Sequence, residues 1–289
     1  MTNGFTLVDF SALAEPAKVL IEKVSDAVGW CFDPVQVRRM ARADADALSI
    51  RTHAEIETDE LKRRAMFRFI NEEAQRQSNI EAITTAAIPK LEEKSNPADL
   101  DNDWVTNFFD KCRITSDTEM QELWSKVLAG EANQPGSFTT RTVNFLSTFS
   151  KSDALLFSKL CAFVVHMPTP QILIFDSEAE IYTNHGINFI DLENLDSMGL
   201  IKFNHVSGFK LHGAFRSLPV RYHENEFAIE CPNEGKNEIS TGKVLFTKMG
   251  HELFRLAKPE SVEGFIPYIS EQFITSGNKI INIHRPAPE

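Results

Sequence analysis

The feature that most constrains the fold is a glycine-free stretch that runs from Pro34 to about Glu93. It is dense in alanine, glutamate, arginine, leucine and glutamine, and Pro89 interrupts it only near its end. Because these residues lose little side-chain freedom in a helix, and because glycine is a common helix breaker, the stretch predicts long helices. The more polar segment 51–60 is where we expect a bend. The sequence therefore predicts either a helical hairpin or one extended helix.

A stripe of mostly apolar side chains follows the second part of this stretch at intervals of three and four residues, as in the seam of a coiled coil. Its members are Met66, Ile70, Ala74, Gln77, Ile80, Thr84, Ala87 and Leu91. A hairpin within one chain and an arm that pairs between subunits explain the stripe equally well. We therefore expect a protein partner or a second copy of the chain, that is, a homo-oligomer.

Residues 11–31 predict a helix near the N-terminus. One of its faces is apolar, because Leu13, Ala17, Leu20, Ile21, Val24, Ala27, Val28 and Cys31 recur at helical spacing. Gly29 and the run from Phe32 to Pro34 end the pattern. Packing on the helices that follow is the expected role of this face, and contact with a membrane surface is the alternative.

The composition argues against several classes of protein. The net charge of −11 disfavours binding to nucleic acid, since that binding relies on basic side chains that displace counterions. We expect neither a signal peptide nor a transmembrane segment. Four well-separated cysteines predict free, mostly buried thiols and a cytoplasmic location. They are Cys31, Cys112, Cys161 and Cys231.

After Pro168 the pattern changes to short β-prone runs separated by turn residues. These runs are 171–177, 180–184, 199–204, 209–213, 218–223, 226–232 and 243–247. Helices are predicted between and after them, near 188–197, 250–257 and 262–273. The order of helix, strand, further strands and helix indicates a winged-helix-like module with an enlarged wing. The predicted class is α+β: a helical hairpin or bundle with a long amphipathic arm over 1–150, then a mixed α/β winged-helix-like domain over 151–289.

The helix before the 199–204 strand would be the recognition helix of such a module. It carries Asp191, Glu193 and Asp196 but neither lysine nor arginine. In a major groove these carboxylates would face phosphates, so a protein-interaction module is the favoured reading. A nucleic-acid-binding regulator remains the alternative.

The segment from Trp104 to Arg141 contains three short helical patterns and is the predicted structural and interaction hub. We expect an aromatic cluster next to a partly buried polar network, in which Glu131 pairs with Arg141. The predicted hub residues are Trp104, Phe108, Phe109, Gln121, Trp124, Glu131 and Arg141.

Signatures of catalysis are absent from the sequence: it has no phosphate-binding glycine loop, no nucleophile elbow and no HExxH. The hub carboxylates could suggest a metal site, but helix capping explains them better. We expect Asp103 as an N-cap and a capping box from Ser116 to Glu119. His212 and His223, on facing strands, would be the candidates for a histidine pair, but solvent-facing strand histidines are the favoured interpretation. The prediction is therefore no catalytic residue, no metal and no cofactor.

Three strings carry a resemblance to known proteins, and they lie between about residues 15 and 257. They are QRQSNIEAITTAAIPKL, the long run from DNDWVTNFF to LLFSKLC, and LFTKMGHELFRLA. The chain resembles an uncharacterised bacterial domain-of-unknown-function family and, more loosely, the abortive-infection alpha proteins of anti-phage systems. The resemblance implies an accessory or effector protein of bacterial and prophage genomes, and it supplies no catalytic residues.

These observations predict a non-enzymatic interaction and assembly protein, a sensor or effector of bacterial anti-phage defence. Assembly would use the stripe, whose seam residues are Met66, Ile70, Gln77, Ile80 and Leu91. The alternatives are a nucleic-acid-binding regulator and, third, a metal-dependent nuclease that uses the carboxylates between residues 103 and 131.

Overall fold

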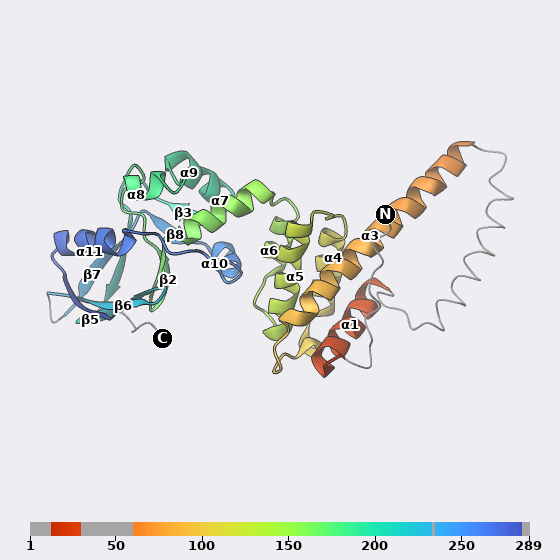
Figure 1. Ribbon diagram of the computed structural model, residues 1–289, viewed down its shortest axis with the longest axis horizontal. Helices are drawn as coiled ribbons and strands as arrows, with labels where there is room; N and C mark the ends of the chain where they lie inside the picture. The colour runs from red at the N-terminus through yellow and green to blue at the C-terminus, as the bar shows by residue number, and fades with distance from the viewer. Residues whose placement is uncertain (1–12, 30–59, 233–234, 285–289) are drawn as a thin grey trace. The chain divides into compact units, whose positions relative to one another are not determined.

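The computed structural model describes residues 13–29, 60–232 and 235–284. The chain divides into two compact units, unit 1 over Met1–Thr148 and unit 2 over Phe149–Glu289. Helices fill the described part of unit 1, whereas unit 2 combines helices with sheets (Figure 1). This distribution confirms the predicted α+β class. Each unit is described by itself below.

Unit 1 is a bundle of helices. Its elements are α1 (Glu15–Val28), α3 (Glu60–Ala87), the 3₁₀ turns η2 (Ile88–Lys90) and η3 (Pro97–Asp99), α4 (Asn102–Cys112), α5 (Thr118–Asn133) and α6 (Thr140–Leu146). The helix expected over 11–31 appears as α1, and Gly29, with a φ of 74°, ends it in a conformation that glycine tolerates best. The long-helix prediction is met by α3, while residues 34–59 lie outside the described residues.

The apolar face of α1 is packed inside unit 1. Ala17, Leu20, Ile21 and Val24 are at most 3% exposed, and the helix lies against α4 and η3. At one side of this contact, Lys23 Nζ donates to the Leu100 carbonyl oxygen (3.0 Å) and to Asn102 Oδ1 (2.7 Å). This face is therefore packed on the helices of unit 1, as expected, and is not exposed to a membrane surface. No helix in the described ranges is long and apolar enough to cross a bilayer.

Helix α3 has two parts with different surroundings. From Asn79 to Ala87 its inner face is buried, and this part packs mainly on α5. Residues 60–78, which we call the α3 arm, are exposed or half-buried throughout and extend beyond the other helices of unit 1 (Figure 1). The predicted stripe is thus partly buried, because Ile80 is 6% exposed whereas Ile70 is 55% exposed.

Unit 2 begins with α7 (Lys151–Cys161), which a Ser150–Asp153 capping box starts. The following elements are β1 (Val164–Met167), β2 (Thr169–Ile172), α8 (Glu180–Thr183), α9 (Phe189–Ser197), β3 (Ile201–Phe203), β4 (Phe209–Gly213), β5 (Ser217–Tyr222), β6 (Asn225–Glu230), β7 (Asn237–Gly242), β8 (Val244–Phe246), α10 (Lys248–Phe254), α11 (Phe265–Thr275) and β9 (Lys279–His284). The predicted β-prone run 180–184 is wrong, because α8 occupies it.

The strands of unit 2 form one larger sheet and two small ones. The larger sheet has the order β2-β1-β5-β6-β9, and its neighbours pair antiparallel. Strand β3 pairs with β8, and β4 pairs with β7, so β4 to β7 are inserted between the two partners of the first pair. At the centre, Tyr222 Oη donates to the Ala162 carbonyl oxygen (2.9 Å) and accepts from the Val262 N–H (2.7 Å). This hydroxyl ties β5 to the end of α7 and to the segment before α11.

The two histidines that the sequence placed on facing strands are apart in the pairing. His212 on β4 lies opposite Glu238 on β7, and its Nδ1 is 3.4 Å from the Glu238 carboxylate. His223 occupies the turn between β5 and β6, with a φ of 51°. The candidate histidine pair is therefore not formed, because β4 and β5 belong to different sheets, and His212 is 65% exposed as the favoured interpretation expects.

Candidate functional site

Four of the predicted hub residues form one aromatic cluster in unit 1. Trp104 stacks on Phe108 with ring centroids 5.1 Å apart, and Phe108 meets Phe109 (5.0 Å) and Trp124 (5.2 Å) edge to face. All four side chains are at most 6% exposed. Three of them come from α4 at spacings that place them on its buried face, and Trp124 comes from α5. The cluster is the core of the bundle and presents no open surface.

Glu131, at the end of α5, holds the turn that follows the helix. Its carboxylate accepts the backbone N–H groups of Gly136 (2.6 Å) and Phe138 (2.7 Å). On the other side, Trp104 Nε1 donates to the Phe138 carbonyl oxygen at 2.7 Å. Phe138 itself packs so close to Gly130 that a Cβ there would lie 2.7 Å from its ring. The LAGExxxPGSF string therefore encodes a turn fastened to α4 and α5.

The ion pair expected between Glu131 and Arg141 is wrong. Arg141 is exposed in the first turn of α6, and none of the ion pairs found among the described residues joins it to Glu131. The carboxylate, which is 5% exposed, takes backbone N–H groups as its partners instead. A buried carboxylate needs hydrogen-bond donors, and a turn with free N–H groups meets that need as well as a guanidinium does.

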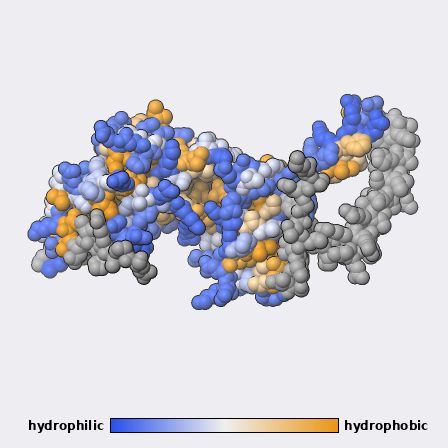
Figure 2. All heavy atoms as spheres, in the orientation of Figure 1, coloured by the Kyte–Doolittle hydropathy of each residue, from blue (hydrophilic) through white to orange (hydrophobic). Residues whose placement is uncertain are grey.

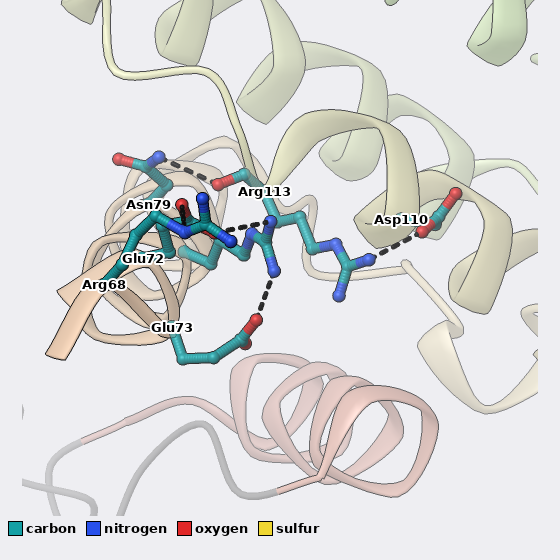
Figure 3. Close-up of polar contacts among 7 residues, drawn as sticks. Arg68, Glu72, Glu73, Asn79, Asp110 and Arg113 are labelled. Carbon is teal, nitrogen blue, oxygen red and sulfur yellow. Dashed lines mark hydrogen bonds and ion pairs between the residues drawn. The ribbon is translucent and has the colours of Figure 1, made fainter. Parts of the chain in front are cut away.

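Gln121 lies in a polar network whose centre the sequence did not reveal. Asn79 of α3 donates to the Arg113 carbonyl oxygen (2.8 Å), and its Oδ1 accepts from Gln121 (3.1 Å) and Gln75 (3.0 Å). Figure 3 shows the contact between Asn79 and the Arg113 backbone. Asn79 is 2% exposed. The network lies where the buried part of α3 meets the arm. The sequence did not predict the role of Asn79, because a single polar residue within a helical pattern is usually exposed.

The hub carboxylates serve local structure. Asp101, rather than the predicted Asp103, caps α4 by accepting the Trp104 N–H at 2.8 Å. Asp117 caps α5 by accepting the N–H groups of Glu119 and Met120, so the predicted capping box beginning at Ser116 is wrong by one residue. Within the described ranges, no group of three or more His, Cys, Asp or Glu side chains is placed to hold a metal ion.

Three of the four cysteines lie in the described part of the chain, and all three are buried thiols outside any disulfide, as predicted. Burial raises the pKa of the Cys161 thiol, which keeps it protonated and unreactive at neutral pH. Cys31 lies outside the described residues.

Replacing Glu131 with glutamine is expected to destabilise unit 1 by about 1–3 kcal/mol, because one of the two backbone N–H groups then faces an NH2 donor and the other keeps only an uncharged acceptor. Urea unfolding followed by tryptophan fluorescence measures the change. Glu93→Gln, at an exposed carboxylate of the same unit, is the matched control and is expected to change little. Full stability of Glu131→Gln, together with loss of a biological activity, would instead speak for a catalytic carboxylate.

The surface that the core and caps leave unexplained is the α3 arm. Five of its large apolar side chains are exposed, and three of them lie together on one side of the helix: Met66 (37%), Phe69 (58%) and Ile70 (55%). We call these three residues the arm patch. Figure 2 shows hydrophobic side chains on the projecting part of α3, beside hydrophilic ones. Solvated helices normally keep such residues toward a core, so clustered exposure of this kind marks an interaction site.

Around the arm patch the arm is strongly charged. Arg68 pairs with Glu72 (3.4 Å), Arg63 pairs with Glu60 (3.5 Å), and Arg76 contacts both Glu72 (3.6 Å) and Glu73. Figure 3 shows Glu73 reaching to an arginine of the same helix. Each pair joins residues about one helical turn apart and is largely exposed to solvent, so it contributes only a few tenths of a kcal/mol to the helix. The arm is therefore a charged helix with an apolar patch.

The fold and the site define a two-unit α+β protein whose first unit carries a projecting helix with an exposed apolar patch. Residues 63–270 match the family model described as "Protein of unknown function (DUF2806)". The chain belongs to this family, which confirms the uncharacterised domain family expected from the sequence. No curated protein and no solved structure matches the chain.

Proposed function

We propose that this protein is a non-enzymatic interaction protein that assembles through the α3 arm. One observation carries the proposal: Met66, Phe69 and Ile70 are 37–58% exposed on a helix that extends beyond its own bundle. Burial of apolar area is the main favourable term in protein association. A partner that covers the arm patch would supply it.

The length and composition of the arm support the same function. An isolated helix of this size is marginal in water, and packing of an amphipathic face normally stabilises it. Among the described residues, α3 has packing of that kind below the arm, where Ile80, Ile83 and Ala87 are buried. The stripe that is buried at the base continues into the arm patch at the same spacing of three and four residues. In an assembly, a partner would pack along the arm in the same way that α5 packs on residues 79–87 of α3.

The biological setting that we propose is bacterial anti-phage defence, with the protein as a sensor or effector. The support is the resemblance of the 75–91, 101–161 and 245–257 strings to abortive-infection alpha proteins. The aromatic hub fits the role of a sensor or effector because it gives the arm a rigid base.

For unit 2 we propose a winged-helix-like module that contacts protein rather than DNA. The support is the order α7, β1, β2, α8, α9, β3 and β8, with β3 paired to β8 and a long insertion between them. At the start of α9, Ile190 is 76% exposed, and Val206 in the β3–β4 connection is 81% exposed. Exposed aliphatic side chains beside the carboxylates of α9 suit a protein surface better than a phosphate backbone.

Replacing Ile70 with glutamate is expected to weaken self-association at least roughly tenfold, because it would place a charge in the buried centre of the contact. Sedimentation velocity over a range of protein concentrations measures it. Ile274→Glu is the matched control, since Ile274 is 56% exposed on α11 of unit 2, about as exposed as Ile70. Plaque counts on bacteria carrying each variant give the biological readout. A wild-type chain that stays monomeric at high concentration would contradict the assembly function.

A further inference from the structure

The arm has a polarity that specifies its partner. Four residues follow one another along its seam at intervals of three, four and three: Arg63, Met66, Ile70 and Glu73. These intervals correspond to the alternating a and d positions of a coiled coil, which face a partner helix. The seam therefore reads positive, apolar, apolar, negative in chain order. Arg63 and Glu73 keep 53% and 41% of their side-chain surface exposed, so both are accessible to a partner.

This order is complementary to itself in only one orientation. In a parallel pair, a meets a and d meets d, which places Arg63 against Arg63 and Glu73 against Glu73. In an antiparallel pair centred on residue 68, Arg63 of one copy meets Glu73 of the other, and Met66 meets Ile70. A twofold axis repeats each contact, so two ion pairs flank an apolar centre. We propose that the occupant of the arm patch is the arm of a second copy, packed antiparallel about an axis at Arg68.

The residue at the axis is compatible with this geometry. If Arg68 faced the partner helix, the twofold axis would bring two like charges together where the helices cross. It lies two residues from both Met66 and Ile70, and helical neighbours at that spacing point to different faces. Its side chain is 78% exposed and pairs with Glu72 at 3.4 Å on its own helix. The guanidinium groups at the axis therefore point away from the seam.

The described helices of unit 1 leave the seam uncovered above Asn79, where a second helix could pack. The seam continues downward into Ile80, Thr84 and Ala87, which are buried where α3 packs on α5. Helix α5 begins at Thr118, and its residue Gln121 lies beside Asn79, at 3.1 Å. The part of the seam above Asn79 therefore extends past the start of α5 (Figure 1). A partner arm would lie in line with α5 and continue its packing along α3.

The inference rests on the proposed assembly function and adds the partner and its direction. Charge reversal tests it in the full-length chain. Arg63→Glu alone and Glu73→Arg alone each create two like-charge contacts in the antiparallel pair, and each is expected to weaken self-association roughly tenfold. The double variant, Arg63→Glu with Glu73→Arg, reverses both partners of every contact. We expect it to associate within about threefold of the wild-type chain.

The double variant separates contacts between copies from contacts within one helix. Arg63 pairs with Glu60, and Glu73 pairs with Arg76, inside the same arm. Both internal pairs become like-charged in the double variant, so a rescue of association can come only from the partner copy. Circular dichroism of each variant reports any change in helix content.

The outcomes distinguish the orientation from the function. Weak single variants and a restored double variant support the antiparallel pair. If Ile70→Glu dissociates the protein but the double variant associates no better than the single ones, the antiparallel pair is overturned while assembly through the arm stands. If the wild-type chain is monomeric at every concentration, both the orientation and the assembly function are overturned.

Discussion

Phe108→Ala is expected to destabilise unit 1 by about 3–5 kcal/mol, the range for removing a large aromatic side chain from a packed core. Phe108 is fully buried, and its ring contacts Trp104, Phe109 and Trp124 at centroid distances of 5.0–5.2 Å. Its removal deprives all three rings of their common partner. Urea unfolding followed by tryptophan fluorescence is a direct measurement, because two of the three tryptophans, Trp104 and Trp124, are neighbours of the deleted ring.

Phe69→Ala is the matched control for this prediction. It removes the same side chain from a position that is 58% exposed on the α3 arm. At protein concentrations low enough to keep the chain monomeric, it is expected to change stability by less than about 1 kcal/mol. A small effect of Phe108→Ala, similar to that of the control, would mean that the aromatic cluster is not the core of unit 1.

Gly250→Ala is expected to destabilise unit 2 by about 3 kcal/mol, the upper end of the usual cost of overpacking. A Cβ at Gly250 would lie 1.9 Å from the Leu200 carbonyl oxygen, a backbone atom that no rotamer change can move. The close approach is fixed by Thr247, whose hydroxyl contacts the carbonyl oxygens of Gly199 (2.6 Å) and Leu200 (3.1 Å). The substitution must therefore separate α10 from the start of β3.

Gly235→Ala gives the control in the same unit, since a Cβ at Gly235 would meet nothing within 4 Å. It is expected to stay within about 0.5 kcal/mol of the wild-type chain. Thermal unfolding monitored by circular dichroism compares the two variants. Equal melting temperatures for them would show that α10 can shift without cost.

The sequence predicted what depends on local periodicity. Trp104, Phe108 and Phe109 were placed on one helical face by their spacing alone, and the structure brings them together with Trp124. The same rule found the stripe in α3. It could not say that the stripe is buried from Ile80 onward and exposed at Ile70, because both parts repeat every three or four residues. The burial of the stripe depends on where α5 begins, and the periodicity of α3 carries no information about that position.

Contacts with the backbone were the main source of error in the site. The prediction that Glu131 pairs with Arg141 assumed that a buried carboxylate needs a charged partner. In the structure, the backbone N–H groups of Gly136 and Phe138 donate to it instead. Asn79 was overlooked for a similar reason, since its best-placed acceptor is the Arg113 carbonyl oxygen. In unit 2, the β3–β8 pairing joins strands about forty residues apart, and spacing rules carry no information at that range.

Because α3 is a single helix of 28 residues, about 42 Å long, its two ends are thermodynamically linked. The base of the helix belongs to the folded core of unit 1, and in the proposed assembly the arm forms the contact between copies. A second copy that binds the folded arm binds the native state in preference to the unfolded one. Mass action then makes the stability of unit 1 rise with the concentration of the protein. A cell that accumulates the chain would, by that act alone, make it harder to unfold and to degrade.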